Sequence, residues 1–379
     1  MNSRERVATA MRLGIPDRVP VMCQLSLGHY FLYSGVDALD VWYTSEGFAE
    51  ALVRLQRRYS FDGILINLPG RDPSWRTQLR GIERREGEQI LSWNRGRYTV
   101  LPDDDLPHTF LADGKRWFPS FAETNPDKLF YAEPHGVEGL EVLSAFPPWQ
   151  FDTIRAVMAR AGDVSVHGEL FSPFSQFLEM LDFENGLMAL LDDPGKVKAC
   201  LEALAAGATT LGRGLAAAGV NAILISSAFA GAGFLSRQHY EEFVLPFEHR
   251  VIAGIKEQFD IPIYTHTCGA IGDRLDLIAA TGSNGIDTLD PPPLGTVELG
   301  EAKSQTSGKV FLKGNLDPVN SLLLATPQTV REAVGRCLRD AAPGGGYILS
   351  SACSVAPRTP PENLLVLGEE VQKKGRYSG

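Results

Sequence analysis

Short apolar runs rich in β-branched residues alternate with longer windows of helical periodicity, and this alternation constrains the fold more than any other feature of the chain. It is typical of parallel strands joined by right-handed crossover helices. Clear helical windows lie at 193–217, 236–258, 272–280 and 327–341. Eight candidate strands are present, at 19–24, 63–68, 164–168, 222–226, 261–265, 285–289, 310–313 and 347–350. Eight units predict an α/β fold closed into a (β/α)8 TIM barrel; the alternative is an open doubly wound sheet.

One stretch interrupts this alternation. Residues 70–150 are rich in proline, glycine and charge, and the part around 81–105 indicates short antiparallel strands with glycine turns. We expect an antiparallel insertion over the barrel mouth, within a single domain spanning 1–379. The alternative is a surface insertion without a functional role.

Charge and cysteine content narrow the possible partners. The formal net charge is −10, which argues against a general nucleic-acid binder. No run approaches the roughly 18 apolar residues of a membrane span, and the charged N-terminal segment lacks a signal-peptide core. Five cysteines, an odd number, favour reduced thiols in the cytoplasm. We therefore expect a cytoplasmic protein that acts on a small-molecule substrate and binds neither nucleic acid nor a membrane. A homodimer is compatible with these features.

His266 and Cys268 form the most distinctive local motif. They follow the fifth candidate strand, and residues two apart in an extended segment point to the same side. An imidazole nitrogen and a thiolate sulfur are ligands that zinc prefers. The other interpretation of this pair alone is a histidine at a strand end beside a buried cysteine.

Cys353 makes the metal interpretation stronger. It follows the eighth candidate strand, so in a barrel it would enter the same mouth as His266 and Cys268 despite its distance along the chain. Three such ligands leave one tetrahedral position open, as in catalytic zinc sites. Cys200 and Cys337 lie in helical windows, and Cys23 ends the first candidate strand; all three are expected to be buried packing residues.

Three further polar residues follow candidate strands at the predicted mouth. Glu169 and Asp290 are candidate catalytic residues, because a carboxylate could fill the fourth zinc position or orient His266. Asn315 is a candidate cofactor contact. The alternative for each of them is a loop residue whose hydrogen bonds are satisfied locally.

Several segments together resemble the uroporphyrinogen decarboxylase superfamily over nearly the whole chain. They are NSRERV at 2–7 with PDRVP at 16–20, YSFDGI at 59–64, SPFS at 172–175, KGNLDP at 313–318 and TPPEN at 359–363. The resemblance implies the (β/α)8 barrel. Porphyrinogen decarboxylases of this superfamily carry an arginine-rich segment after the first strand, whereas residues 24–30 here read QLSLGHY, without arginine.

The superfamily's corrinoid-dependent methyltransferases carry a His-x-Cys motif and a distant cysteine as zinc ligands, and His266, Cys268 and Cys353 are similar to that pattern. The resemblance implies a zinc-dependent methyltransferase that moves a methyl group between a methylcorrinoid and a thiol or related acceptor. The chain has no Asp-x-His-x-x-Gly signature, so the corrinoid would come from a partner protein or as free methylcobalamin. The alternative function is a decarboxylase or lyase acting on a small carboxylated substrate other than uroporphyrinogen.

Overall fold

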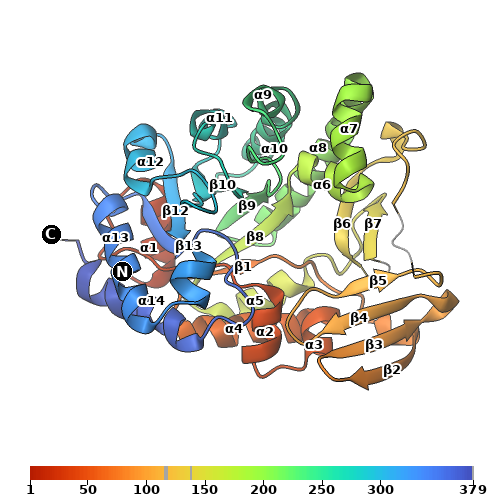
Figure 1. The fold of residues 1–379 in the computed structure, drawn as a ribbon, viewed down its shortest axis with the longest axis horizontal. Helices are drawn as coiled ribbons and strands as arrows, with labels where there is room; N and C mark the ends of the chain where they lie inside the picture. The colour runs from red at the N-terminus through yellow and green to blue at the C-terminus, as the bar shows by residue number, and fades with distance from the viewer. Residues whose placement is uncertain (115–117, 137–138, 378–379) are drawn as a thin grey trace.

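A curled parallel β-sheet forms the centre of the protein in the computed structural model, which describes residues 1–114, 118–136 and 139–377. Within these residues the sheet has seven strands, and their order in space follows their order in the chain (Figure 1). The strands are β1 (Gly63–Ile66), β8 (Ser165–Phe171), β9 (Ala222–Ser226), β10 (Ile263–Thr267), β11 (Gly285–Thr288), β12 (Phe311–Leu316) and β13 (Tyr347–Ser351). Seven of the eight predicted strands are thereby confirmed, with small differences at their ends.

The strand expected at 19–24 is not formed, and the prediction of a closed eight-stranded barrel is wrong in that respect. Val21 makes an isolated bridge with Leu349, and Leu25, just after the segment, makes another with Val355. On the other side of the segment a single backbone hydrogen bond runs from Asp62 N to Val21 O. Pro20 has no backbone N–H, which removes one of the donors that a regular ladder would need.

Helices connect and cover the strands. They are α1 (Ser3–Met11), α2 (Leu27–Tyr33), α3 (Ala38–Tyr43), α4 (Ser45–Tyr59), α5 (Asp152–Ala161), α6 (Pro173–Leu181), α7 (Phe183–Asp192), α8 (Pro194–Ala217), α9 (Arg237–Phe243), α10 (Leu245–Lys256), α11 (Leu275–Ala280), α12 (Leu299–Thr306), α13 (Pro327–Ala341) and α14 (Pro361–Lys374). Local sequence sets their ends: Thr326 caps α13 by accepting from Thr329 N, and Pro327 occupies its first turn. Among the described residues, none of these helices is both long and apolar enough to cross a membrane.

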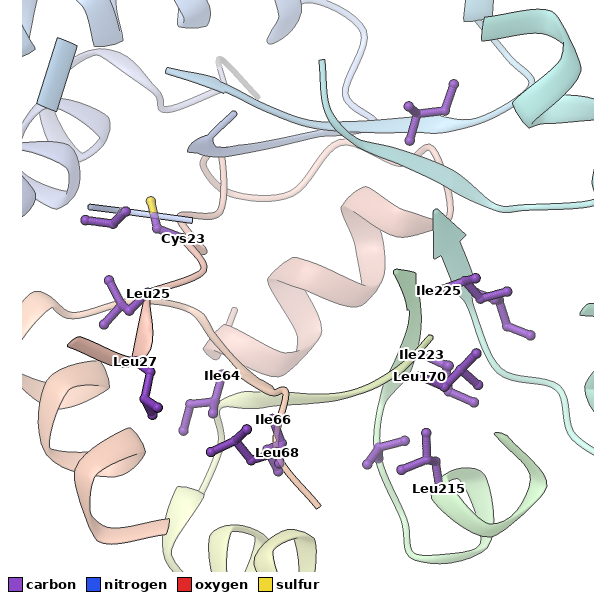
Figure 2. Close-up of a cluster of buried hydrophobic side chains, with 14 of the residues drawn as sticks. Cys23, Leu25, Leu27, Ile64, Ile66, Leu68, Leu170, Leu215, Ile223 and Ile225 are labelled. Atoms are coloured by element: carbon purple, nitrogen blue, oxygen red, sulfur yellow. The ribbon is translucent and has the colours of Figure 1, made fainter. Parts of the chain in front are cut away.

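Strand side chains alternate between two separate cores. One face of each strand packs on the surrounding helices, as Ile64, Ile223 and Ile225 do, with Leu215 of α8 nearby (Figure 2). The opposite face fills the inside of the curled sheet with Leu224, Tyr264, Phe311 and other residues of a second cluster. Because successive side chains of a strand point to opposite faces, the same alternation decides which polar residues point into the interior.

Helix α1 closes one end of this interior. Its residues Val7, Ala10 and Met11 belong to the inner cluster. Arg6 of the same helix and Arg18 both pair with the buried Asp62 carboxylate, at 2.7 and 2.8 Å. The N- and C-terminal segments also meet at this end, where Val19 N donates a hydrogen bond to Gly375 O (Figure 1).

The predicted antiparallel insertion is present between β1 and α5. It contains a sheet of β2 (Leu79–Arg85), β3 (Glu88–Trp93), β4 (Tyr98–Pro102) and β5 (His108–Phe110), and a separate hairpin of β6 (Tyr131–Gly136) and β7 (Gly139–Leu143) (Figure 1). Asp104 of the insertion pairs with Arg358 at 2.5 Å. Arg358 lies in the loop after β13 that also carries Cys353, so the insertion borders the end of the sheet where the strands finish.

Candidate metal centre

His266, Cys268 and Cys353 converge on one point at the C-terminal ends of the strands. The Sγ atom of Cys268 lies 3.3 Å from Nε2 of His266 and 3.3 Å from Sγ of Cys353. Single ligand atoms from the three residues all lie within 4.8 Å of one another. All five cysteines of the chain fall within the described residues and are free thiols.

The curl of the sheet produces this meeting. Tyr264 and His266 share the inner face of β10, and Cys268 continues that direction just beyond the strand end. Cys353 follows β13, which is three places away from β10 in the sheet. Only a strongly curved sheet can bring the ends of these two strands within contact distance.

Asp287 and Lys313 form a charged row behind His266. Asp287 of β11 is the register partner of both His266 on β10 and Lys313 on β12. Its Oδ2 lies 3.1 Å from His266 Nδ1, and its Oδ1 accepts from Lys313 Nζ at 2.8 Å. A carboxylate can only accept, so Nδ1 of His266 carries a proton and donates it to Asp287, while Nε2 faces the cluster sulfurs.

This row corrects the expectation that Glu169 or Asp290 orients His266, because Asp287 holds that position. Sequence reasoning missed Asp287 and Lys313. The available signal was a charged residue alternating with apolar ones inside each strand: Ile286 and Leu312 belong to the outer core, so Asp287 and Lys313 must point inward.

The electrostatics of the cluster favour one thiolate. Hydrogen bonding from Cys268 and the nearby His266 lowers the pKa of Cys353 to about 4, against the effect of burial. The pKa of Cys268 is raised, chiefly by its hydrogen bond to Cys353. Burial lowers the pKa of His266, but Asp287 and Cys353 outweigh it and raise the pKa to about 10. Burial raises the pKa of Asp287, yet Lys313 and His266 bring it below the usual value.

These donors fit a zinc ion. In a tetrahedral site with bonds of about 2.0–2.3 Å, neighbouring ligand atoms stand about 3.3–3.8 Å apart, and the two contacts of Cys268 have that length. The orienting carboxylate on His266 is also the usual companion of a metal-bound imidazole.

Asp290 supports the loop that carries Cys268. Its Oδ2 accepts a hydrogen bond from Gly269 N at 2.6 Å. Burial raises the pKa of Asp290 to about 6. The structure therefore places Asp290 beside the cluster, in contact with the turn after Cys268.

Glu169 lies on the inner face of β8, because its neighbour Leu170 belongs to the outer core. Its Oε2 is buried and has no hydrogen-bond partner among the described residues. Burial raises its pKa to about 7, opposed by the charge of His266. Oε2 can therefore bind a ligand, while Ser226 hydrogen-bonds to the same carboxyl group.

Asn315 is not brought to the cluster. Its Nδ2 donates to Leu289 O at 3.0 Å, and its Oδ1 accepts from Cys337 Sγ of α13 at 3.7 Å. Lys313 faces the interior, but Asn315 contacts a covering helix, so the alternation assumed for β12 does not continue through Gly314. Cys23, Cys200 and Cys337 are buried, as expected for packing residues.

Comparison with curated proteins finds relatives that are named uroporphyrinogen decarboxylase. The uroporphyrinogen decarboxylase of Alkalilimnicola ehrlichii is 31% identical over 237 residues, which are 60% of this chain and 62% of that protein. The uroporphyrinogen decarboxylase of Thioalkalivibrio sulfidiphilus is 32% identical over 189 residues, 49% of this chain and 51% of that protein. The matches thus span between about half and three fifths of these relatives' length.

Two solved structures share the fold. A methyltransferase from Methanosarcina mazei superposes with a TM-score of 0.73 at 15% identity, covering 98% of this chain and 99% of its own. A B12-independent methionine synthase from a Shewanella species has a TM-score of 0.53 at 13% identity, covering 94% and 98%. At such identities the likeness concerns the architecture.

The family assignment rests on a longer stretch of sequence. The family model described as uroporphyrinogen decarboxylase (URO-D) matches residues 125–374, about two thirds of the chain. This stretch runs from just before β6 through α14 and contains His266, Cys268 and Cys353. The chain belongs to the uroporphyrinogen decarboxylase family.

Proposed function

We propose that this protein is a zinc-dependent methyltransferase that moves a methyl group between a methylcorrinoid and a thiol or a related acceptor. The observation that carries the proposal is the cluster of His266 Nε2, Cys268 Sγ and Cys353 Sγ within 4.8 Å of one another. Three such ligands leave a tetrahedral ion one open position for a substrate sulfur, as in catalytic zinc sites.

His266, Cys268 and Cys353 would hold the zinc. When bound, the ion supplies Lewis acidity that converts a thiol into a thiolate at neutral pH. Asp287 fixes the tautomer of His266, and Lys313 keeps Asp287 charged in a buried place. These two residues therefore prepare the ligand set before any substrate arrives.

Glu169 would take the proton of the incoming thiol. The new sulfur–carbon bond forms as the cobalt–carbon bond breaks and its electron pair stays on cobalt, so one proton must leave the acceptor. Glu169 Oε2 is buried and lacks a partner among the described residues, which suits it to receive that proton. Asp290 would act indirectly, by holding the turn beside Cys268.

The full-length likeness to a protein named methyltransferase agrees with this proposal. At 15% identity this structural likeness supports the fold alone, so the proposed reaction rests on the cluster of His266, Cys268 and Cys353. The lack of arginine at 24–30 argues against uroporphyrinogen as the substrate, because the resemblance assigns an arginine-rich segment there to porphyrin carboxylates. The corrinoid would be supplied by a partner protein or as free methylcobalamin, and reduced thiols suit work in the cytoplasm.

A second candidate is a decarboxylase or lyase for a small carboxylated substrate. Identities of 31–32% to proteins named uroporphyrinogen decarboxylase favour it. In such an enzyme the ion would polarise a carboxylate or carbonyl of the substrate.

Metal content and methylcobalamin turnover together test the proposal. Protein purified without chelators should contain one zinc per chain and demethylate methylcobalamin in the presence of a suitable thiol from a panel. Cys353→Ser should lose both properties, whereas Cys200→Ala, in α8, should keep both. A zinc-free wild type would contradict the metal centre. Bound zinc without demethylation across the thiol panel, together with release of carbon dioxide from a carboxylated substrate, would favour the second candidate.

A further inference from the structure

A cavity lies outside the curled sheet, away from the candidate metal centre. Its volume is about 710 Å³, within the usual range of small-molecule sites. It lies between the start of α4, one side of α5 and the loop that follows β1. The alanines Ala156 and Ala159 line it on the α5 side and leave room there. None of its lining residues belongs to the candidate metal centre.

Arginines dominate the charge of this cavity. Arg71, Arg76, Arg155 and Arg160 line it, against the two carboxylates Glu46 and Asp152. This excess of positive charge is notable in a chain with a net charge of −10. The ion pair of Arg155 with Asp152 is well exposed, and so is that of Arg76 with Asp40, so both are weak and open to exchange with a ligand.

The start of helix α4 adds to the positive potential. Thr44 and Ser45 line the cavity, and the helix runs for 15 residues from Ser45. Thr44 caps it by accepting from Gly47 N. A helix of this length carries a partial positive charge at its N-terminus, which attracts anions.

One wall of the cavity is aromatic. Tyr43 and Trp75 line it and stack on each other with ring centroids 4.7 Å apart. The guanidinium of Arg76 lies over the Trp75 ring at 4.4 Å. The Tyr43 hydroxyl is buried beside Thr99 and Trp42, which hydrogen-bond to it. Tyr43 and Trp75 are both about 3% exposed, so the stacked pair is a fixed part of the wall.

We propose that this cavity binds a phosphate monoester whose other end is a planar ring. Guanidinium forks on both sides would hold the phosphate oxygens, since arginine matches that geometry with paired N–H donors. The ring would occupy the space beside Ala156 and Ala159, next to the Trp75 ring that the Arg76 guanidinium covers. This binding site is separate from the metal centre and goes beyond the proposed methyl transfer.

Calorimetric titration of the full chain with phenyl phosphate, inorganic phosphate and phenol tests the proposal. Phenyl phosphate should bind saturably and more tightly than inorganic phosphate, and phenol should bind most weakly. Binding of phenyl phosphate should change tryptophan fluorescence, because Trp75 lies in the wall of the cavity. Added salt should weaken phenyl phosphate binding, as expected for charged contacts near the surface.

Single substitutions identify the site. Arg76→Gln and Arg155→Gln should each weaken phenyl phosphate binding by about tenfold, and both arginines are exposed enough for the fold to tolerate the change. Arg250→Gln is the matched control, because Arg250 is a similarly exposed arginine paired with a carboxylate, Glu202, on another face. Absence of saturable binding at millimolar phenyl phosphate would overturn the proposal, and so would equal affinity in all four proteins. Equal binding of phenyl phosphate and inorganic phosphate would overturn the aromatic part.

Discussion

Asp287 Oδ2 lies 3.1 Å from Nδ1 of His266, and the two residues are register partners on neighbouring strands. The strand pairing therefore fixes the imidazole without help from any loop. Sites built on strands are held more precisely than sites built on loops. The contact also makes the candidate metal centre testable through a residue that is not itself a ligand.

Replacing Asp287 should weaken zinc binding. In Asp287→Asn the side chain keeps its size but no longer accepts as a carboxylate, so His266 loses its fixed tautomer. We expect zinc affinity to fall by roughly 10–100-fold, measured by competition with a chromophoric chelator.

Asp290→Asn is the matched control for that measurement. Asp290 follows the same strand, and its amide replacement can still accept from Gly269 N. Its zinc affinity should stay close to that of the wild type. A greater loss in Asp290→Asn than in Asp287→Asn would assign the orienting role to Asp290 instead.

Substitutions of Lys313 and Asp287 should change the free energy of unfolding in a non-additive way. Both side chains are about 2% exposed, so removing one partner leaves a buried charge uncompensated. Lys313→Met should lower the free energy of unfolding by about 3–5 kcal/mol. The double variant Lys313→Met with Asp287→Asn should cost less than the sum of the two single changes. Urea unfolding of the metal-free proteins measures this, and strict additivity would show that the pair is not coupled.

Glu248 should make the protein less stable as pH rises. Burial raises its pKa in the folded protein to about 7, only partly opposed by Ser227, whereas the unfolded value is about 4.3. Between these two pKa values the folded protein holds a proton that the unfolded chain has lost, so stability decreases with pH until about pH 7. Glu248→Gln should remove this loss.

The gain in unfolding free energy from Glu248→Gln should therefore be roughly 2–3 kcal/mol larger at about pH 8 than at about pH 5. Comparing the two pH values cancels any effect of the amide itself. Glu241→Gln, with an exposed carboxylate on α9, serves as the control and should show no such difference. A gain from Glu248→Gln that is the same at both pH values would show that Glu248 titrates normally.

Metal removal should expose the two cluster thiols to oxidation. The Sγ atoms of Cys268 and Cys353 are 3.3 Å apart, and the pKa of Cys353 is lowered to about 4, so a reactive thiolate is present. Mild oxidant should remove two of the five titratable thiols from the metal-free protein and none from the zinc-loaded protein. Cys268→Ser should abolish the difference. Loss of thiols from the zinc-loaded protein at the same rate would mean that the ion does not engage these cysteines.

Much of the architecture could be predicted from local sequence. The seven strands that form are short apolar runs, and α13 begins where Thr326 and Pro327 indicate a helix start. The segment at 19–24 has the same apolar character, but it takes up bridges instead of a ladder. Strand formation there depends on partners on both sides, and Pro20 removes one donor, so the local pattern was insufficient.

The sequence by itself determined which residues could bind a metal: an imidazole and a thiol two positions apart, and a distant second thiol, all placed after strands. Tertiary structure alone decided the rest. The curl of the sheet sets the distance between Cys268 and Cys353, and the strand register selects Asp287 over Glu169 and Asp290 as the partner of His266. The break in alternation after Lys313 turns Asn315 toward α13. The physical reason is that sequence fixes the direction of a side chain from its own strand, whereas the neighbour it meets depends on register and curvature, which are properties of the whole sheet.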